Sequence, residues 1–170
     1  MRVANPANAI NASVCPSGFV RSMIIESPVQ LIFRDLFYRL PAFAESHDVF
    51  LKLEGFNITG SIKIKTAIGL VESLEQRGVA RPNETVLVES SSGNLGLALS
   101  LVCAIKGYKF ICVTDPNATR TTVRGMELYG AKVIVVEDRD PAGGYLGSRL
   151  KKIDSNTANE PERGLAQSIC

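Results

Sequence analysis

The amino-acid sequence predicts an α/β protein built from βαβ units around a parallel sheet. From residue 49 onward, short runs of β-branched residues alternate with segments of helical periodicity, which is typical of parallel strands joined by crossover helices. The runs are almost continuously apolar, which indicates strands buried on both faces. A chain of 170 residues with 45% hydrophobic side chains can bury one sizeable core, so we expect a folded chain.

Strands and helices alternate in a regular order along this part of the chain. The predicted strands are 49–53, 85–89, 109–113 and 132–136. The predicted helices are 61–77, 94–106, 118–129 and a last one that is entered through Gly143 and Gly144, after Pro141, and extends to Ile153. Gly78 and Gly130 follow the first and third helices, and glycine is favoured just beyond a helix end.

The two ends of the chain are less regular than this α/β region, which we assign to residues 49–156. Residues 1–48 are interpreted as an N-terminal arm, in which 29–37 is expected to form a short helix closed by Pro41. Residues 157–170 lack apolar periodicity and are expected to be a divergent, polar and disordered tail.

Composition and charge exclude several kinds of partner. The net charge is +2 and the basic residues are scattered, so no face is expected to bind nucleic acid. No apolar run approaches the ~20 residues of a membrane span. The longest, 95–105, is broken by Ser100 and fits a buried helix. No secretory signal is recognisable at the N-terminus, so a cytoplasmic location is expected.

The chain offers few ligands for a metal ion and few groups for a histidine-based catalytic triad. His47 is the single histidine, and the cysteines form no C-x-x-C pair. We expect no metal site and interpret the widely spaced thiols as structural or incidental; they are Cys15, Cys103, Cys112 and Cys170.

Lys63 occupies an unusual place, the first turn of the helix predicted over 61–77. An exposed cation there opposes the helix macrodipole by roughly 0.3–1 kcal/mol. The same field favours the neutral amine, which is the form that condenses with an aldehyde cofactor. The alternative is an ordinary surface lysine, as Lys65 would be, and spacing alone favours that alternative.

A second pattern follows the strand predicted over 85–89. Ser91, Ser92 and Gly93 lie between that strand and an apolar helix, where backbone N–H groups and hydroxyls form a cradle for a carboxylate or phosphate. The alternative is a common serine N-cap with a glycine turn. The ordered pair, G-S-x-K and then S-S-G-N-x-G, each between a strand and a helix, is more specific than either motif alone.

With both motifs in place, the sequence resembles the fold-type II pyridoxal-phosphate (PLP) enzymes, the family of cysteine synthase, cystathionine β-synthase and threonine deaminase. The resemblance implies the three-layer, tryptophan synthase β-like fold, of which this chain would hold the N-terminal half, with PLP as cofactor. It implies that Lys63 is the catalytic lysine that bonds to PLP and that Asn94 contacts the cofactor's phenolic oxygen. Ser91, Ser92, Gly93 and Asn94 would bind the carboxylate of the amino-acid substrate.

The lysine motif departs from the family pattern at several positions. The segment N-I-T-G-S-I-K-I-K matches the family's N-P-x-G-S-x-K-D-R at Asn57, Gly60, Ser61 and Lys63. The departures are Ile58 for proline, Ile64 and Lys65 for aspartate and arginine, and Leu95 for a threonine of the second motif.

Within the family, three motifs are most similar to one transferase branch, that of N-(2-amino-2-carboxyethyl)-L-glutamate synthase; they are GSIKIKTA, ESSSGNLG and GGYLGSR. Enzymes of this branch make 2,3-diaminopropionate precursors for siderophores. This implies β-replacement on O-phosphoserine or O-acetylserine by an amine such as glutamate, and a homodimer for a full-length enzyme. The alternatives are a cysteine synthase that uses sulfide, a serine or threonine dehydratase, and a non-catalytic α/β domain that binds a small anion.

The family's glycine-rich phosphate loop has no counterpart before Cys170, and we interpret GGYLGSR as a helix start instead. We therefore expect a C-terminally truncated chain with apolar surface left uncovered. The resemblance leaves open whether this chain is an active transferase or lyase.

Overall fold

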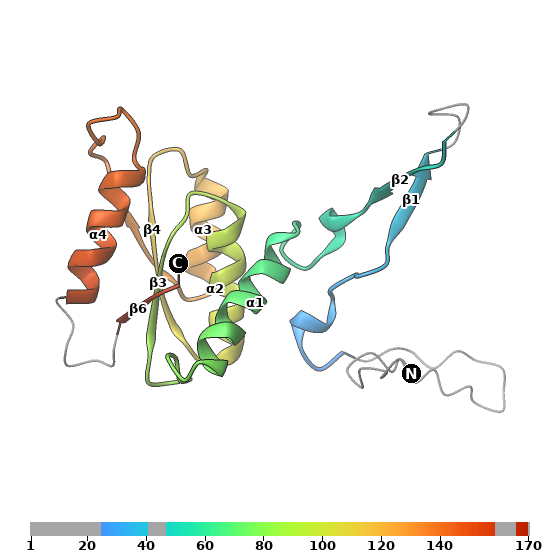
Figure 1. Cartoon of the computed structure of the whole chain (residues 1–170), viewed down its shortest axis with the longest axis horizontal. Coiled ribbons are helices and arrows are strands. Elements are labelled where there is room, and N and C mark those ends of the chain that lie inside the picture. The colour runs from blue at the N-terminus through green and yellow to red at the C-terminus, as the bar shows by residue number, and fades with distance from the viewer. Residues whose placement is uncertain (1–24, 41–46, 159–165, 170) are drawn as a thin grey trace.

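Four parallel strands form the central layer of the α/β part of the molecule, in the computed structural model, which describes residues 25–40, 47–158 and 166–169 (Figure 1). The strands are β3 (Val86–Ser90), β4 (Lys109–Thr114), β5 (Lys132–Val135) and β6 (Ala166–Ser168), in the sheet order β5-β4-β3-β6. All three pairings are parallel, which confirms the predicted α/β class. Most of the proposed arm and tail, with Cys15, Pro41 and Cys170, lies outside the described residues.

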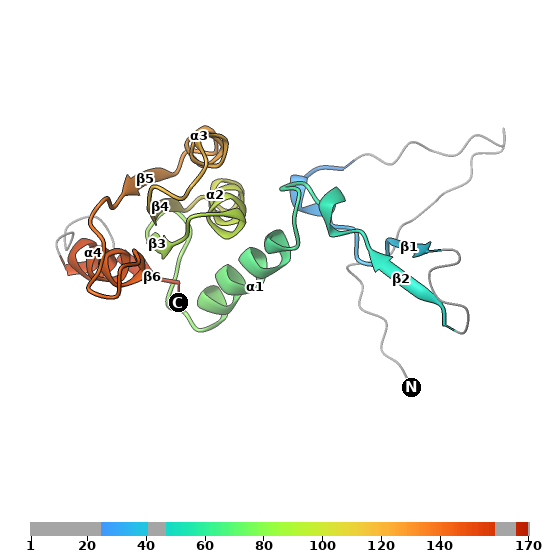
Figure 2. The same cartoon turned by 90° about the horizontal axis from the view of Figure 1, so that it is seen from above.

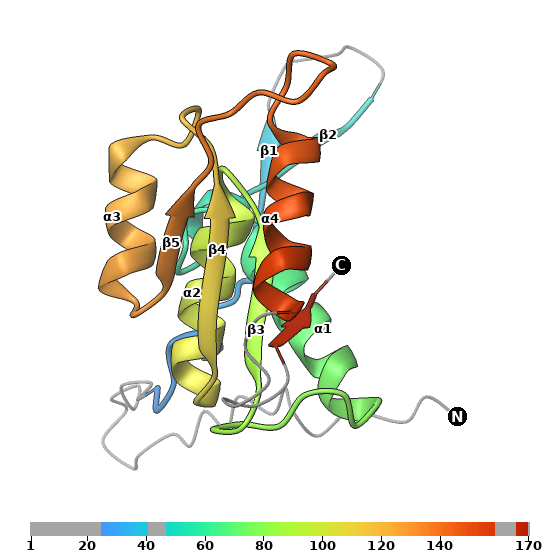
Figure 3. The ribbon, with the colours of Figure 1, turned by 90° about the vertical axis from the view of Figure 1, so that its left-hand side faces the viewer.

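Helices cover both faces of this sheet, so the architecture has three layers (Figure 3). The helices are α1 (Lys63–Gln76), α2 (Asn94–Lys106), α3 (Arg120–Leu128) and α4 (Leu146–Ala158). The first three pack with Leu87 and Phe110 into the larger core, while Ile153 of α4 packs with Val88 and Val113 on the opposite face. All four predicted helices are confirmed, including the one that begins after the two glycines. No helix in the described part of the chain is long and apolar enough to cross a membrane.

The spacing of apolar residues explains why α1 forms and how it packs. Its buried side chains recur every three or four positions and therefore lie on one side of the helix; they are Ile64, Ala67, Val71 and Leu74. The helix ends before Gly78, whose φ of +69° is the left-handed conformation that glycine adopts without strain. α1 packs against α2, and this contact holds its N-terminal turn beside the sheet domain.

The first strands form an antiparallel hairpin that projects from the α/β layers, and here two predictions are wrong (Figure 2). β2 (Val49–Lys52) pairs with β1 (Phe37–Leu40) and lies outside the parallel sheet in which 49–53 was expected. Instead of a helix over 29–37, the chain has a 3-10 helix, Pro28–Gln30, followed by an irregular segment that leads into β1. A short apolar run does not by itself reveal its strand partner, and the aromatic residues of β1 suit a strand.

The hairpin leaves large apolar side chains exposed. Tyr38 and Leu51 are register partners on one face, and Phe37 and Phe50 lie on the other. All four are exposed. A two-stranded hairpin on its own is only marginally stable in water. Burial therefore supports this hairpin less than it supports the parallel sheet.

The proposed disordered tail contains a short strand, which corrects that expectation. β6 pairs in parallel with β3, and the N–H of Ile169 donates to the carbonyl oxygen of Val88 at 3.1 Å. The Ile169 side chain is buried in the larger core. Three paired residues are too few to show a period in the sequence, so the strand could not be predicted from the pattern.

Candidate functional site

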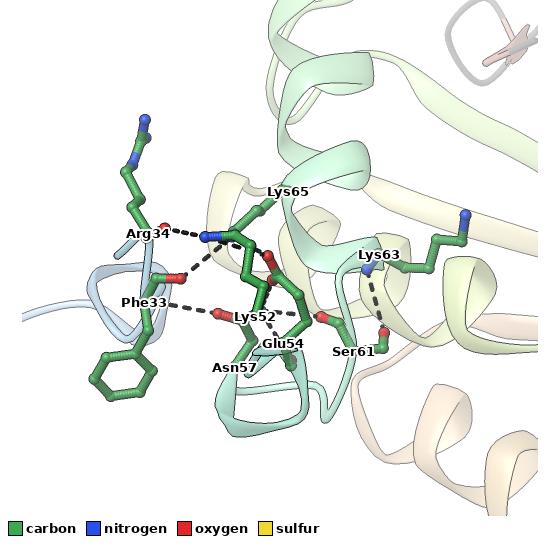
Figure 4. Close-up of polar contacts among 8 residues, drawn as sticks. All are labelled: Phe33, Arg34, Lys52, Glu54, Asn57, Ser61, Lys63 and Lys65. Atoms are coloured by element: carbon green, nitrogen blue, oxygen red, sulfur yellow. Dashed lines mark hydrogen bonds and ion pairs between the residues drawn. The ribbon is translucent and has the colours of Figure 1, made fainter. Parts of the chain in front are cut away.

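Lys63 is the first residue of α1 and follows a tight turn. The turn contains Gly60, whose φ is +69°, and Ser61, whose Oγ accepts the backbone N–H of Lys63 at 3.2 Å. The Lys63 side chain is exposed and points away from the polar residues that surround the turn (Figure 4). Within the described residues, no carboxylate lies within ion-pair distance of its amine. The amine is therefore accessible to an aldehyde ligand.

The S-S-S-G-N segment forms the turn between β3 and α2. Ser91 is buried, and its Oγ accepts the backbone N–H groups of Gly96 at 2.9 Å and Gly93 at 3.3 Å. This hydroxyl thus supports the loop from inside. Ser92 and Gly93 are partly exposed and Asn94, the first residue of α2, is exposed. The N–H groups of a helix's first turn have no acceptor within the helix, and those of α2 that Ser91 does not bind are available to an anion.

This loop lies where a ligand is expected in an open parallel sheet. From β3 the chain proceeds to β4 and β5 on one side, with α2 and α3 on one face, and then returns through α4 on the other face to β6. The direction of the connections therefore reverses at β3. Ligands of such sheets bind outside the carboxyl ends of the strands at this reversal, where Ser91 to Asn94 follow β3.

The structure brings the two motifs to neighbouring helices. Lys63 begins α1 and Asn94 begins α2, and these helices pack side by side (Figure 1). No hydrogen bond joins Lys63 to the 91–94 loop in the described part of the chain. The two motifs thus lie at the starts of adjacent helices. A ligand bound between them would be needed to link them.

A third loop at the same edge was predicted only as a helix start. Asp140 follows β5, and its carboxylate accepts the backbone N–H groups of Ala142 at 3.0 Å, Gly144 at 3.0 Å and Gly147 at 2.9 Å. Gly143, with a φ of +82°, allows the chain to turn around it. The Asp-Pro pair before two glycines is a known turn signal and could have identified Asp140 from the sequence.

The stability that Asp140 provides is expected to depend on pH. Its hydrogen bond from Gly147, followed by those from Gly144 and Ala142, lowers the pKa of the Asp140 carboxyl against the opposing effect of burial. Because the folded pKa is below the unfolded one, the contribution is complete above about pH 4 and is lost as the pH falls through the folded pKa. The melting-temperature difference between wild type and Asp140→Asn should therefore shrink from pH 6 to pH 3. A difference that stays constant over this range would contradict the assignment.

Comparison with known proteins identifies the family. A profile described as pyridoxal-phosphate dependent enzyme matches residues 30–164, which is most of the chain. The chain belongs to this family. Its members use PLP, and the three-layer architecture corresponds to part of the tryptophan synthase β-like fold.

Several solved structures resemble the chain over most of its length. A hydrogen sulfide-producing enzyme from Fusobacterium nucleatum matches with a TM-score of 0.74 and 26% identity, covering 87% of this chain and 46% of that one. A structure of O-ureido-L-serine synthase matches with a TM-score of 0.63 and 29% identity, covering 78% and 43%. A lysine-to-alanine mutant of that synthase, with O-ureido-L-serine bound, matches with a TM-score of 0.68 and 27% identity, covering 81% and 42%. The chain thus spans less than half the length of these structures.

The residues present fit PLP in their chemistry. Lys63 offers an exposed primary amine for the aldehyde, and Asn94 offers an exposed amide that can hydrogen-bond a ring oxygen. The described residues include no group of three or more metal-ligating side chains. The candidate site therefore consists of Lys63 and the 91–94 loop.

Proposed function

We propose that this chain carries the lysine and the substrate loop of a PLP-dependent transferase that performs β-replacement on an O-activated L-serine. The observation that carries the proposal is the accessible amine of Lys63 at the first residue of α1, in a chain that belongs to the PLP family. The substrate class is supported by the resemblance to O-ureido-L-serine synthase. O-Phosphoserine or O-acetylserine would be the substrate, with an amine such as glutamate as the nucleophile.

Each site residue has a defined task in this reaction. The Lys63 amine would hold the cofactor and, when free, would accept the proton from the substrate's Cα. Ser92 and Asn94 would bind the substrate carboxylate through their backbone N–H groups, while the buried Ser91 hydroxyl, which accepts the N–H groups of Gly93 and Gly96, keeps their loop in shape. The Asn94 amide would hydrogen-bond the cofactor ring. PLP, when bound, acts as the electron sink that makes loss of the Cα proton and of the β-leaving group possible.

The first test asks whether Lys63 bonds to PLP. The purified chain is incubated with PLP, reduced with borohydride and mapped by peptide mass spectrometry. We expect the phosphopyridoxyl group on Lys63 in wild type, and loss of both this adduct and the PLP absorbance band in Lys63→Ala. Lys132→Ala is the matched control because Lys132 is also exposed but lies at the start of β5, and it should behave like wild type. A folded wild-type chain without a Lys63 adduct would refute the proposal.

The second test concerns the nucleophile. The similarity to the hydrogen sulfide-producing enzyme favours sulfur chemistry as a second candidate function. PLP-loaded chain is therefore supplied with O-phosphoserine or O-acetylserine and either glutamate or sulfide. A glutamate adduct of the β-carbon supports the amine reaction, cysteine supports the sulfide reaction, and a keto acid alone indicates a dehydratase.

A further inference from the structure

A polar network surrounds the turn that carries Lys63 and connects it to distant parts of the chain. Its centre is Asn57, whose side chain is only 3% exposed. Asn57 Oδ1 accepts the backbone N–H of Phe33 at 3.1 Å, and Nδ2 donates to the carbonyl oxygen of Glu54 at 3.0 Å and to Glu54 Oε2 at 2.7 Å. This side chain thereby ties the segment before β1 to the 3-10 helix, Glu54–Phe56, after β2.

A charged pair extends the network into α1. Lys65 Nζ donates to Glu54 Oε1 at 2.8 Å and to the carbonyl oxygen of Phe33 at 3.2 Å. The hydrogen bond from Lys65 is the main reason that the pKa of Glu54 is lowered, and Asn57 and Lys52 act in the same direction. One carboxylate therefore bridges the buried amide and the first turn of the helix.

The network holds the chain on both sides of Lys63 but does not touch its side chain (Figure 4). On one side, Asn57 Nδ2 lies 3.4 Å from the carbonyl oxygen of Ser61. On the other side, Lys65 is bound to Glu54. Residues two apart in an α-helix are rotated by about 200°, so fixing Lys65 on one side of the first turn directs Lys63 to the opposite side.

We propose that Glu54, Asn57 and Lys65 are positioning residues that set the direction in which Lys63 presents its amine. This inference rests on the proposed role of Lys63 as the lysine that bonds PLP. The cation at position 65 is essential to it, since a neutral side chain there would break the connection between Glu54 and the first turn of α1, even though Asn57 and Lys52 would still hold Glu54. An arginine at this position retains the charge and the hydrogen-bond donors.

The first measurement needs no cofactor and follows backbone hydrogen exchange over residues 57–66. Lys65→Met should accelerate exchange there by about tenfold, the factor expected for loss of one charge-assisted hydrogen bond. Glu54→Gln should act in the same direction, whereas Lys65→Arg and the distant control Lys132→Met should resemble wild type. Circular dichroism establishes that each variant is folded. Unchanged exchange in folded Lys65→Met would overturn the proposal.

The second measurement compares the share of borohydride-trapped PLP that is found on Lys63 with the share on the other lysines. A purely structural role would lower the melting temperature without redirecting the adduct. We expect Lys65→Met to reduce the Lys63 share and Lys65→Arg to restore it. An equal share in wild type and Lys65→Met overturns the inference. If wild type forms no Lys63 adduct, the proposed function fails, and the exchange measurement alone still decides whether the network orders the turn.

Discussion

Replacing Arg149 by methionine is expected to destabilise the chain by about 3–5 kcal/mol, the usual effect of removing one partner of a buried ion pair. Arg149 Nη1 lies 3.0 Å from Asp115 Oδ2, with side-chain exposures of 13% and 4%. Asp115 follows β4 and Arg149 belongs to α4, so the pair fixes α4 to the carboxyl edge of the sheet. The variant would leave the Asp115 carboxylate buried without its cation. Urea denaturation measures the loss.

A matched control distinguishes burial from charge. Arg124 also faces a carboxylate, Glu127, at 3.8 Å, but its side chain is 82% exposed, so Arg124→Met should cost less than about 1 kcal/mol. Arg149 Nε and Nη1 make no aligned hydrogen bond. The attraction between the two charges therefore only partly offsets the free-energy cost of removing them from water. The double variant Asp115→Asn/Arg149→Met should therefore recover much of the loss. Equal effects of Arg149→Met and Arg124→Met would contradict this assignment.

Gly96→Ala is expected to destabilise the chain by about 1–3 kcal/mol because there is no room for a methyl group. A Cβ at this position would lie 2.7 Å from Met126 Cε, 2.9 Å from Cys112 Sγ and 3.2 Å from Ser91 Cβ. The start of α2 would have to move away from β4, and the 91–94 loop would move with it. We therefore expect a lower denaturation midpoint together with a smaller share of PLP on Lys63.

Replacing a glycine of α1 by alanine should instead increase the stability of the chain. Gly69 lies inside that helix, and a Cβ there meets no atom within 4 Å. Alanine is favoured over glycine in a helix interior by about 0.5–1 kcal/mol, so Gly69→Ala should raise stability. If both variants shifted the midpoint in the same direction, crowding at Gly96 would not be the cause.

The sequence predicts the parallel sheet and its helices well because each has a strong local signal. α2 is predicted residue for residue, since its apolar run begins after Gly93 and ends before Gly107, whose φ is +77°. Antiparallel pairing of β1 with β2 depends on contacts between segments that carry no turn signature, and the sequence shows only their apolar character. The same limit applies to β6, whose partner β3 lies far away in the chain.

The candidate site likewise combines residues that the sequence predicts with supporting contacts that it does not predict. Lys63 and the 91–94 loop follow from short contiguous motifs, and their local positions at two helix starts agree with the prediction. What supports them comes from contacts distant in sequence. The bond from Asn57 to Phe33 and the pair of Asp115 with Arg149 each join separate segments, and no spacing rule predicts such partners. The internal use of the Ser91 hydroxyl likewise requires coordinates.

The position of β6 beside β3 imposes an order on folding. β3 and β4 are separated by one helix, so they can pair early, whereas β3 and β6 enclose a loop that contains every other strand of the sheet. Closing so long a loop costs chain entropy that is repaid only after the intervening strands have formed. β6 should therefore join last and detach first, and its amides should show the weakest exchange protection of the parallel strands. The nucleation of this sheet is consequently expected to begin at β3 and β4, next to the loop that contains Ser91.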